Sequence, residues 1–165
     1  AHDGRSGDAL AEALVRTASR TTAAVGAAGG AIAAAEMVAP PTLLGIPLQL
    51  AAETLLVVAV ELRLIGELHE VYGRPVTGTA RQRATALVTA WVRRRGVDPL
   101  SGSVAGALGL AARRELRARV LRRLGRNVTT LAPFLAGAVA GAEINRRETA
   151  SLAERVLADL RGRRG

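Results

Sequence analysis

The chain contains no cysteine and no lysine, and Phe, Trp, Tyr and Met occur only once each among its 165 residues. The absence of cysteine excludes disulfide frameworks, thiolate metal sites and cysteine nucleophiles. A β-sandwich needs β-branched and aromatic residues, so an aromatic content of 2% argues against that class. The chain is instead rich in aliphatic residues, and 34 of them are alanine, the residue with the highest helix propensity. The composition therefore predicts a single all-α domain.

Helix start and stop signals predict a bundle of six or seven helices after a flexible tail at 1–7. Asp8 is expected to cap the first helix, and Pro40 and Pro41 end it. Gly73 suits the residue that follows a helix, and Thr79 suits the cap of the next one. We expect helices at 8–38, 47–72, 79–95, 101–124, 131–145 and 147–161.

The helix expected at 47–72 is apolar on nearly all sides. Such a helix is either central in a bundle or faces lipid, and we expect it to be central, with glycine-rich helices packed against it. It carries Glu53, Glu61 and Arg63, however, which argues against a membrane span. The longest uncharged runs, Met37–Ala52 and Asn127–Ala142, have only 16 residues, whereas a span needs roughly 20. No signal-peptide pattern is visible either. We expect a soluble chain or one that associates with a membrane surface.

Glycines four residues apart occur in three segments, a spacing that lets helix backbones approach closely. Glycine inside a helix costs about 0.5–1 kcal/mol relative to alanine, so something close to it must compensate. Packing within a bundle, membrane-type packing and a pocket for an apolar ligand all remain open. The residues predicted to form this close packing or apolar pocket are Gly26, Gly30, Gly102, Gly106, Pro133, Gly137, Gly141 and Asn145.

Positive charge is concentrated in one segment: residues 81–126 carry a net charge of +10, and residues 1–80 carry −3. A basic amphipathic helix of this kind can lie on an anionic membrane surface. A solvated arginine face is an alternative, and nucleic acid is a third, which the shortage of aromatic side chains for base stacking argues against. The predicted anionic-lipid surface consists of Arg113, Arg114, Arg117, Arg119, Arg122, Arg123 and Arg126.

Four glutamates are polar groups in otherwise apolar helices, namely Glu36, Glu53, Glu61 and Glu143. A di-iron bundle would need Glu-x-x-His pairs, but the residue three before His69 is Gly66. We therefore expect no metal, no cofactor and no enzymatic activity. The buried glutamates either pair with arginines or stay partly neutral, which would permit pH-dependent insertion. The candidate partners are Arg16, Arg20 and Arg63.

The stretch from Leu131 to Asn145, LAPFLAGAVAGAEIN, resembles the end of the EcsC-like proteins, "P-x-x-G-x-x-x-G-x-x-x-N". In that family a Thr-containing amphipathic helix follows, as Thr149 and the segment to Leu160 do here. The Pro-rich entry to the long helix and the segment Ile65–Gly73, similar to the family's "I-A-x-x-Y-G", extend the likeness to roughly residues 25–160. The resemblance implies a helical bacterial protein associated with membranes or secretion machinery, with no established enzymatic activity.

These observations together predict a non-enzymatic protein that binds a membrane surface, a lipid or another apolar ligand. The expected location is the bacterial cytoplasm, peripheral to the inner membrane, with anionic lipid as the partner. One alternative is a structural or protein-interaction module, either a homo-oligomer or a secretion-system component. A second alternative is a membrane-inserting, pore-forming effector.

Overall fold

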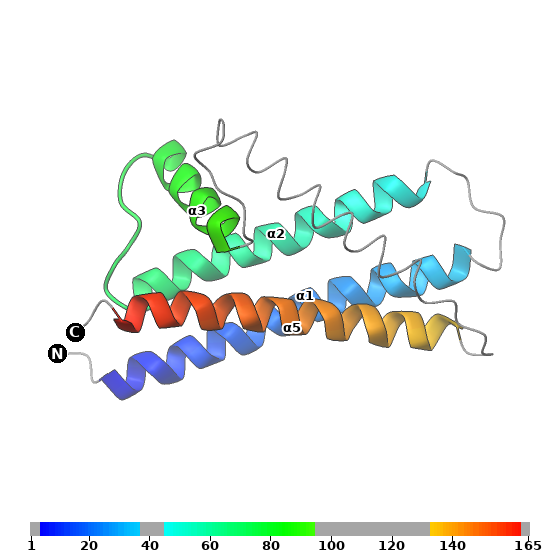
Figure 1. The fold of residues 1–165 in the computed structure, drawn as a ribbon, viewed down its shortest axis with the longest axis horizontal. Helices are drawn as coiled ribbons and strands as arrows, with labels where there is room; N and C mark the ends of the chain where they lie inside the picture. The colour runs from blue at the N-terminus through cyan, green and yellow to red at the C-terminus, as the bar shows by residue number, and fades with distance from the viewer. Residues whose placement is uncertain (1–3, 37–44, 95–132, 163–165) are drawn as a thin grey trace.

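The computed structural model describes residues 4–36, 45–94 and 133–162, and all regular secondary structure within these ranges is helical. The all-α prediction is therefore confirmed for this part of the chain. The four helices are α1 (Gly4–Glu36), α2 (Gly45–Val71), α3 (Ala80–Arg94) and α5 (Pro133–Gly162), shown in Figure 1. The helix predicted at 101–124 lies outside the described residues.

Three long helices, α1, α2 and α5, lie along one another, and the short α3 packs against α2 (Figure 1). Helix α1 is antiparallel to both of its long neighbours. Its residue Asp8 contacts Tyr72 and Arg161 at one end of the bundle, whereas Gly29 accepts a 3.0 Å hydrogen bond from Gln49 of α2 towards the other end. Helices α2 and α5 consequently run parallel.

The aliphatic core occupies the half of the bundle where α1 begins and α5 ends. Helix α2 contributes the largest share, and the single tryptophan of the chain, Trp91, packs into the core from α3 with no exposed surface. The largest fully buried apolar side chains of this core are Leu64, Ile65, Leu68, Trp91, Val92, Leu152 and Val156.

Two predicted helix boundaries are wrong. Helix α1 begins at Gly4, so Asp8 lies inside the helix and binds Tyr72 instead of capping. The helices predicted at 131–145 and 147–161 are one continuous helix, α5, because no glycine or proline interrupts residues 142–161. Asn145 does not end a helix; its side chain donates to the carbonyl of Thr22 across the bundle.

The connection between α2 and α3 follows the sequence signals closely. Gly73 has a φ of 68°, and its N–H donates to Glu70 O while Arg74 N–H donates to His69 O, which is the Schellman ending of a helix. Thr79 and Gln82 then exchange side-chain and backbone hydrogen bonds of 2.8 and 3.3 Å, the capping box that starts α3. The roles predicted for Gly73 and Thr79 are confirmed.

Within the described ranges, no helix combines the length and the apolar character needed to cross a membrane.

Candidate functional site

Helices α1 and α5 cross in backbone contact at two pairs of glycines, where Gly26 faces Gly141 and Gly30 faces Gly137. A Cβ atom placed on Gly26 would lie 2.6 Å from Nδ2 of Asn145 and 2.6 Å from the carbonyl carbon of Gly141. A Cβ on Gly30 would lie 2.5 Å from the carbonyl carbon of Gly137. These separations are too short for real carbon atoms, so only glycine permits this crossing.

The glycines therefore pack differently from the sequence expectation. The stripes on α1 and α5 face each other and do not pack against the long apolar helix α2. Their backbones fill the space between α1 and α5, which leaves no room there for an apolar ligand. Helix α2 contacts all three other described helices, but Leu55 and Leu56 on its outer face are 67% and 56% exposed. Gly102 and Gly106 lie outside the described residues, as does the side chain of Pro133.

A network of buried polar side chains lies beside the glycine crossing. Asn145 of α5 donates from Nδ2 to Thr22 O of α1 at 3.0 Å, and the same nitrogen lies 3.5 Å from Oε1 of Glu53 in α2. The hydroxyls of Thr22 and Thr149 are 2.9 Å apart and share a hydrogen bond. Because unbonded polar groups are costly to bury, these contacts fix how the three long helices align.

Glu61 continues this network into the aliphatic core and has no exposed surface. Its Oε2 accepts a 2.7 Å hydrogen bond from Nε1 of Trp91, and its Oε1 accepts a 3.2 Å hydrogen bond from Oγ1 of Thr149. Glu61 thus connects α2 to both α3 and α5. Glu61, Glu53 and Asn145 were among the predicted site residues, whereas Thr22 and Trp91 were not. The available signal was an uncharged polar residue on an otherwise apolar helix face.

The predicted arginine partners of the buried glutamates are wrong. Arg16 pairs with Glu12 at 3.5 Å, and Arg63 pairs with Glu67 at 2.7 Å; both pairs are i,i+4 neighbours on the helix surface. Arg20 makes no ion pair within the described residues. The buried carboxylates of Glu53 and Glu61 instead accept hydrogen bonds from hydroxyl, indole and amide groups on other helices.

Glu143 is a surface residue, unlike Glu53 and Glu61. Its carboxylate accepts two 2.8 Å hydrogen bonds from Arg146 and a further one from Arg147. Hydrogen bonds from these two guanidinium groups lower the pKa of Glu143 from 4.5 to about 2. The side chain of Glu36, the fourth predicted glutamate, lies outside the described residues.

A cluster of three polar side chains joins the helix ends on the other side of the core. The hydroxyl of Tyr72 donates to Asp8, and Arg161 donates to Tyr72 at 3.2 Å and to Asp8 at 3.1 Å. Burial, followed by the hydrogen bond to Asp8, raises the pKa of Tyr72 above 10.0. All three polar groups are occupied by one another, so we assign this cluster a structural role.

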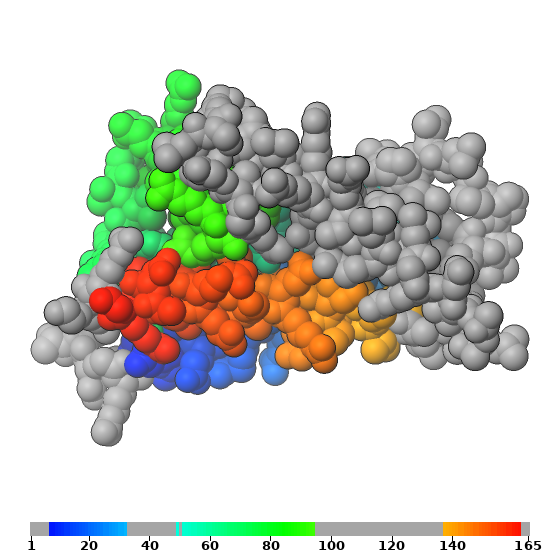
Figure 2. Space-filling model, viewed as in Figure 1, coloured from blue at the N-terminus to red at the C-terminus, as the bar shows by residue number. Residues whose placement is uncertain are grey.

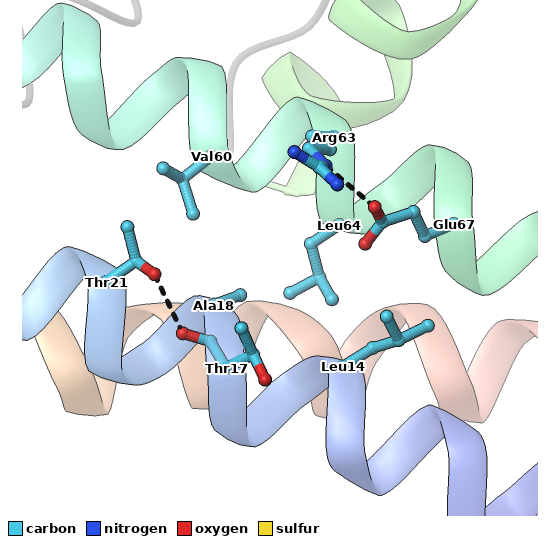
Figure 3. Close-up of a pocket in the computed structure, with 8 residues that line it drawn as sticks. All are labelled: Leu14, Thr17, Ala18, Thr21, Val60, Arg63, Leu64 and Glu67. Carbon is cyan, nitrogen blue, oxygen red and sulfur yellow. Dashed lines mark hydrogen bonds and ion pairs between the residues drawn. The ribbon is translucent and has the colours of Figure 1, made fainter.

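An open groove of about 200 Å³ lies between α1 and α2 (Figure 3). Apolar side chains form most of its wall, and the ion pair of Arg63 and Glu67 lies at its edge. The hydroxyls of Thr17 and Thr21 donate to carbonyls of their own helix, so the groove has little polar chemistry of its own. Its lining residues are Leu14, Thr17, Ala18, Thr21, Val60, Arg63, Leu64 and Glu67.

No metal-binding group of three or more His, Cys, Asp or Glu side chains is present among the residues that the structure describes. His69, the only internal histidine, has its Nδ1 atom 2.7 Å from the carbonyl oxygen of Ile65 in its own helix. The ring therefore serves the local helix structure.

The surface of the bundle changes character along its length. We call the apolar end the part formed by 21–35 of α1, 45–60 of α2 and 133–142 of α5, in which the only charged residue, Glu53, is buried. Four large aliphatic side chains are exposed there, about half or more of each, namely Ile32, Leu55, Leu56 and Val139. Figure 2 shows α5 along the near face of the molecule, with α3 and α1 on either side of it.

No protein-family model, curated protein or solved structure matches this chain. The resemblance to the EcsC-like proteins consequently stays a prediction based on the residues quoted for it. The predicted lipid-binding arginines, Arg113 to Arg126, lie outside the described residues.

Proposed function

We propose that this protein is not an enzyme and that it binds anionic membrane surfaces. The observation that carries the proposal is the apolar end, which exposes four large aliphatic side chains and no charged group among its described side chains. Contiguous exposed apolar surface is typical of sites that contact membranes or proteins.

The exposed aliphatic side chains supply a driving force for this binding. Full burial of a Val, Leu or Ile side chain is worth about 1.5–3 kcal/mol. Because these four are already partly covered, transfer into lipid gains about 1 kcal/mol for each of them. The sum is enough for reversible association with a surface but small compared with the insertion of a spanning helix.

Positive charge supplies the preference for anionic lipid. The chain carries a net charge of +9, and the proposed contact helix at 113–126 contains seven arginines. Each basic residue near an anionic membrane surface contributes about 1 kcal/mol. The resemblance to EcsC-like proteins supports the same setting, at the cytoplasmic side of a bacterial inner membrane.

Co-sedimentation with liposomes tests the proposal. The purified protein is mixed with vesicles of phosphatidylcholine alone or with equal parts of phosphatidylglycerol, at low and at high salt. We expect binding to the anionic vesicles that weakens at high salt without disappearing, because salt screens the arginines but not the apolar contacts. Failure to sediment with either vesicle would refute the proposal.

A second candidate function is the binding of a single apolar ligand, and the groove between α1 and α2 favours it. Native mass spectrometry of the purified protein tests this alternative, since a co-purified lipid would add a defined mass. Protein without any adduct would count against it.

Another alternative is a protein-interaction module or homo-oligomer, in which the apolar end would bind a protein. Replacement of three arginines in the predicted helix 113–126 by glutamine separates this alternative from the membrane proposal. The substitution should weaken vesicle binding and leave a protein interface at the apolar end intact.

A further inference from the structure

The exposed stripe of α1 changes from charged to apolar at one point. Arg16 and Arg20 are followed, at intervals of four residues, by Ala24, Ala28 and Ile32, and all five are exposed. Residues four apart are neighbours on a helix surface, so these five side chains form one exposed stripe that winds gradually around the helix. No charge follows Arg20 until the last residue of the helix.

Helix α2 shows the same change in the opposite chain direction, as its antiparallel orientation requires. Its outward stripe begins at the exposed Arg63 and continues through Ala59, Leu56, Leu55 and Ala52, all of them exposed. On this helix too, the apolar part points towards the apolar end of the bundle.

Helix α5 completes the pattern. Arg146 and Arg147 are exposed, and two turns closer to the start of the helix Val139 is 67% exposed. Glu143, between them, is held by both arginines. The stripe therefore changes from basic to apolar within these two turns.

The arginines of the three helices lie at neighbouring levels along the bundle. Asn145 contacts Thr22, which sets Arg146 and Arg147 close to the level of Arg20 in the antiparallel α1. Arg63 lines the same groove as Thr17 and Thr21 (Figure 3). We call this set the arginine belt, and its members are Arg16, Arg20, Arg63, Arg146 and Arg147.

The arginine belt is net positive. Its five arginines meet three glutamates, Glu12, Glu67 and Glu143, which leaves a charge of +2. Arg20 has no acidic partner in the described part of the chain. Guanidinium groups bind phosphate oxygens with two parallel hydrogen bonds, so the belt matches the phosphate layer of an anionic bilayer.

We propose, building on the membrane-binding function above, that the apolar end enters the membrane and that the arginine belt contacts the lipid phosphates. From Arg20 to Ile32 the helix rises about 18 Å at 1.5 Å per residue. This length is close to half of the roughly 30 Å hydrocarbon core, so the end reaches through one leaflet. All three long helices change from basic to apolar at neighbouring levels, and a basic band next to an apolar end is the charge pattern of a surface that enters an anionic bilayer.

Depth measurements test this orientation, and the absence of cysteine in the natural chain makes single-site labelling clean. Leu56→Cys places an NBD fluorophore at the apolar end. Ala158→Cys places the same fluorophore on an exposed site of the opposite half of the bundle, where α1 begins and α5 ends, which we call the charged half. With vesicles of phosphatidylcholine and phosphatidylglycerol, the label at 56 should shift to the blue and be quenched by nitroxide lipids. The label at 158 should show neither change.

Charge variants test the arginine belt itself. Arg20→Gln with Arg147→Gln removes two belt charges, and Arg81→Gln with Arg155→Gln removes two exposed charges elsewhere. At 0.15 M salt, screening limits strong effects to charges within about 8 Å of the phosphates. The first double variant should bind anionic vesicles about 30-fold more weakly, at about five-fold per arginine. The second should stay within two-fold of the natural chain, and circular dichroism checks that both variants fold.

The outcomes separate this inference from the function on which it rests. Suppose that the natural chain binds vesicles, but that the label at 158 is quenched in place of that at 56, or that both double variants weaken binding equally. Either result would show that the orientation is wrong, while the membrane function would stand. If the natural chain binds no vesicle, both are wrong. A concentration-dependent dimer that Leu56→Arg dissolves would then assign the apolar end to a second copy of the chain.

Discussion

Replacement of Gly26 by alanine should destabilise the protein, although alanine favours helices by about 1 kcal/mol over glycine. The new Cβ would lie 2.6 Å from both Asn145 Nδ2 and the carbonyl carbon of Gly141. Helices α1 and α5 would have to separate, which weakens the hydrogen bond from Asn145 to Thr22 O. Overpacking of this kind costs about 1–3 kcal/mol, and a lost buried hydrogen bond costs about 1 kcal/mol more.

Gly66→Ala is the matched control, because Gly66 also lies inside a long helix. A Cβ there would meet only the two Cδ atoms of Leu87 at 3.8 Å, an ordinary contact. Both substitutions restrict the unfolded chain equally, so their difference reports on the folded state. Gly66→Ala should therefore stabilise the protein by about 0.5–1 kcal/mol.

Urea unfolding followed by circular dichroism measures both effects, and thermal unfolding should show shifts of about 2–4 °C for each kcal/mol. The two variants should move the midpoint in opposite directions. If Gly26→Ala raised the midpoint as Gly66→Ala does, the backbone contact between α1 and α5 would be refuted.

Three further predictions follow from other contacts. Glu61→Ala should destabilise the protein by about 1–3 kcal/mol because it leaves buried donors unpaired. The fluorescence emission of Trp91, the only tryptophan, should shift as well. Unchanged emission would contradict the hydrogen bond between Glu61 and Trp91. Because the pKa of Glu143 falls from 4.5 to about 2 on folding, its contribution to stability is complete above pH 4.5 and is lost as the pH falls towards 2. Urea midpoints of Glu143→Gln should lack that pH dependence; an identical pH profile would refute the assignment. The double substitution Leu55→Ser with Leu56→Ser should change the free energy of unfolding by less than about 0.5 kcal/mol per site, yet weaken sedimentation with vesicles several-fold. Loss of folding would show that these side chains belong to the hydrophobic core.

Local signals in the sequence predicted the helices well where the deciding contacts are local. Gly73 and Thr79 act through hydrogen bonds to residues within five positions, so their roles could be derived from neighbouring residues. Asp8 was predicted to cap a helix and Asn145 to end one, but both lie inside helices and bind partners on other helices. Their role depends on tertiary packing, which a local pattern does not contain.

The candidate site shows the same division. The four-residue spacing of glycines predicted close backbone contact, but it could not say that α1 and α5 supply both sides of that contact. The sequence singled out Glu61 as a polar group in an apolar helix, but its donors, Trp91 and Thr149, are 30 and 88 residues away. The arginine belt was not predicted, because its members are far apart in sequence and come together only when the helices align.

The two halves of the bundle are stabilised by different interactions, and the difference bears on the proposed contact with a membrane. Every buried aliphatic residue in the described part lies at or before Ala18 in α1, at or after Val57 in α2, in α3, or at or after Leu152 in α5. Apart from Val57 and Val58, the buried residues of the apolar end are glycines and polar side chains, so little of its aliphatic surface is removed from water. Since apolar burial is the main driving force of folding, the charged half supplies most of the stability in water. The apolar end keeps aliphatic side chains that the fold itself does not bury, and a bilayer would bury them without any change in the core.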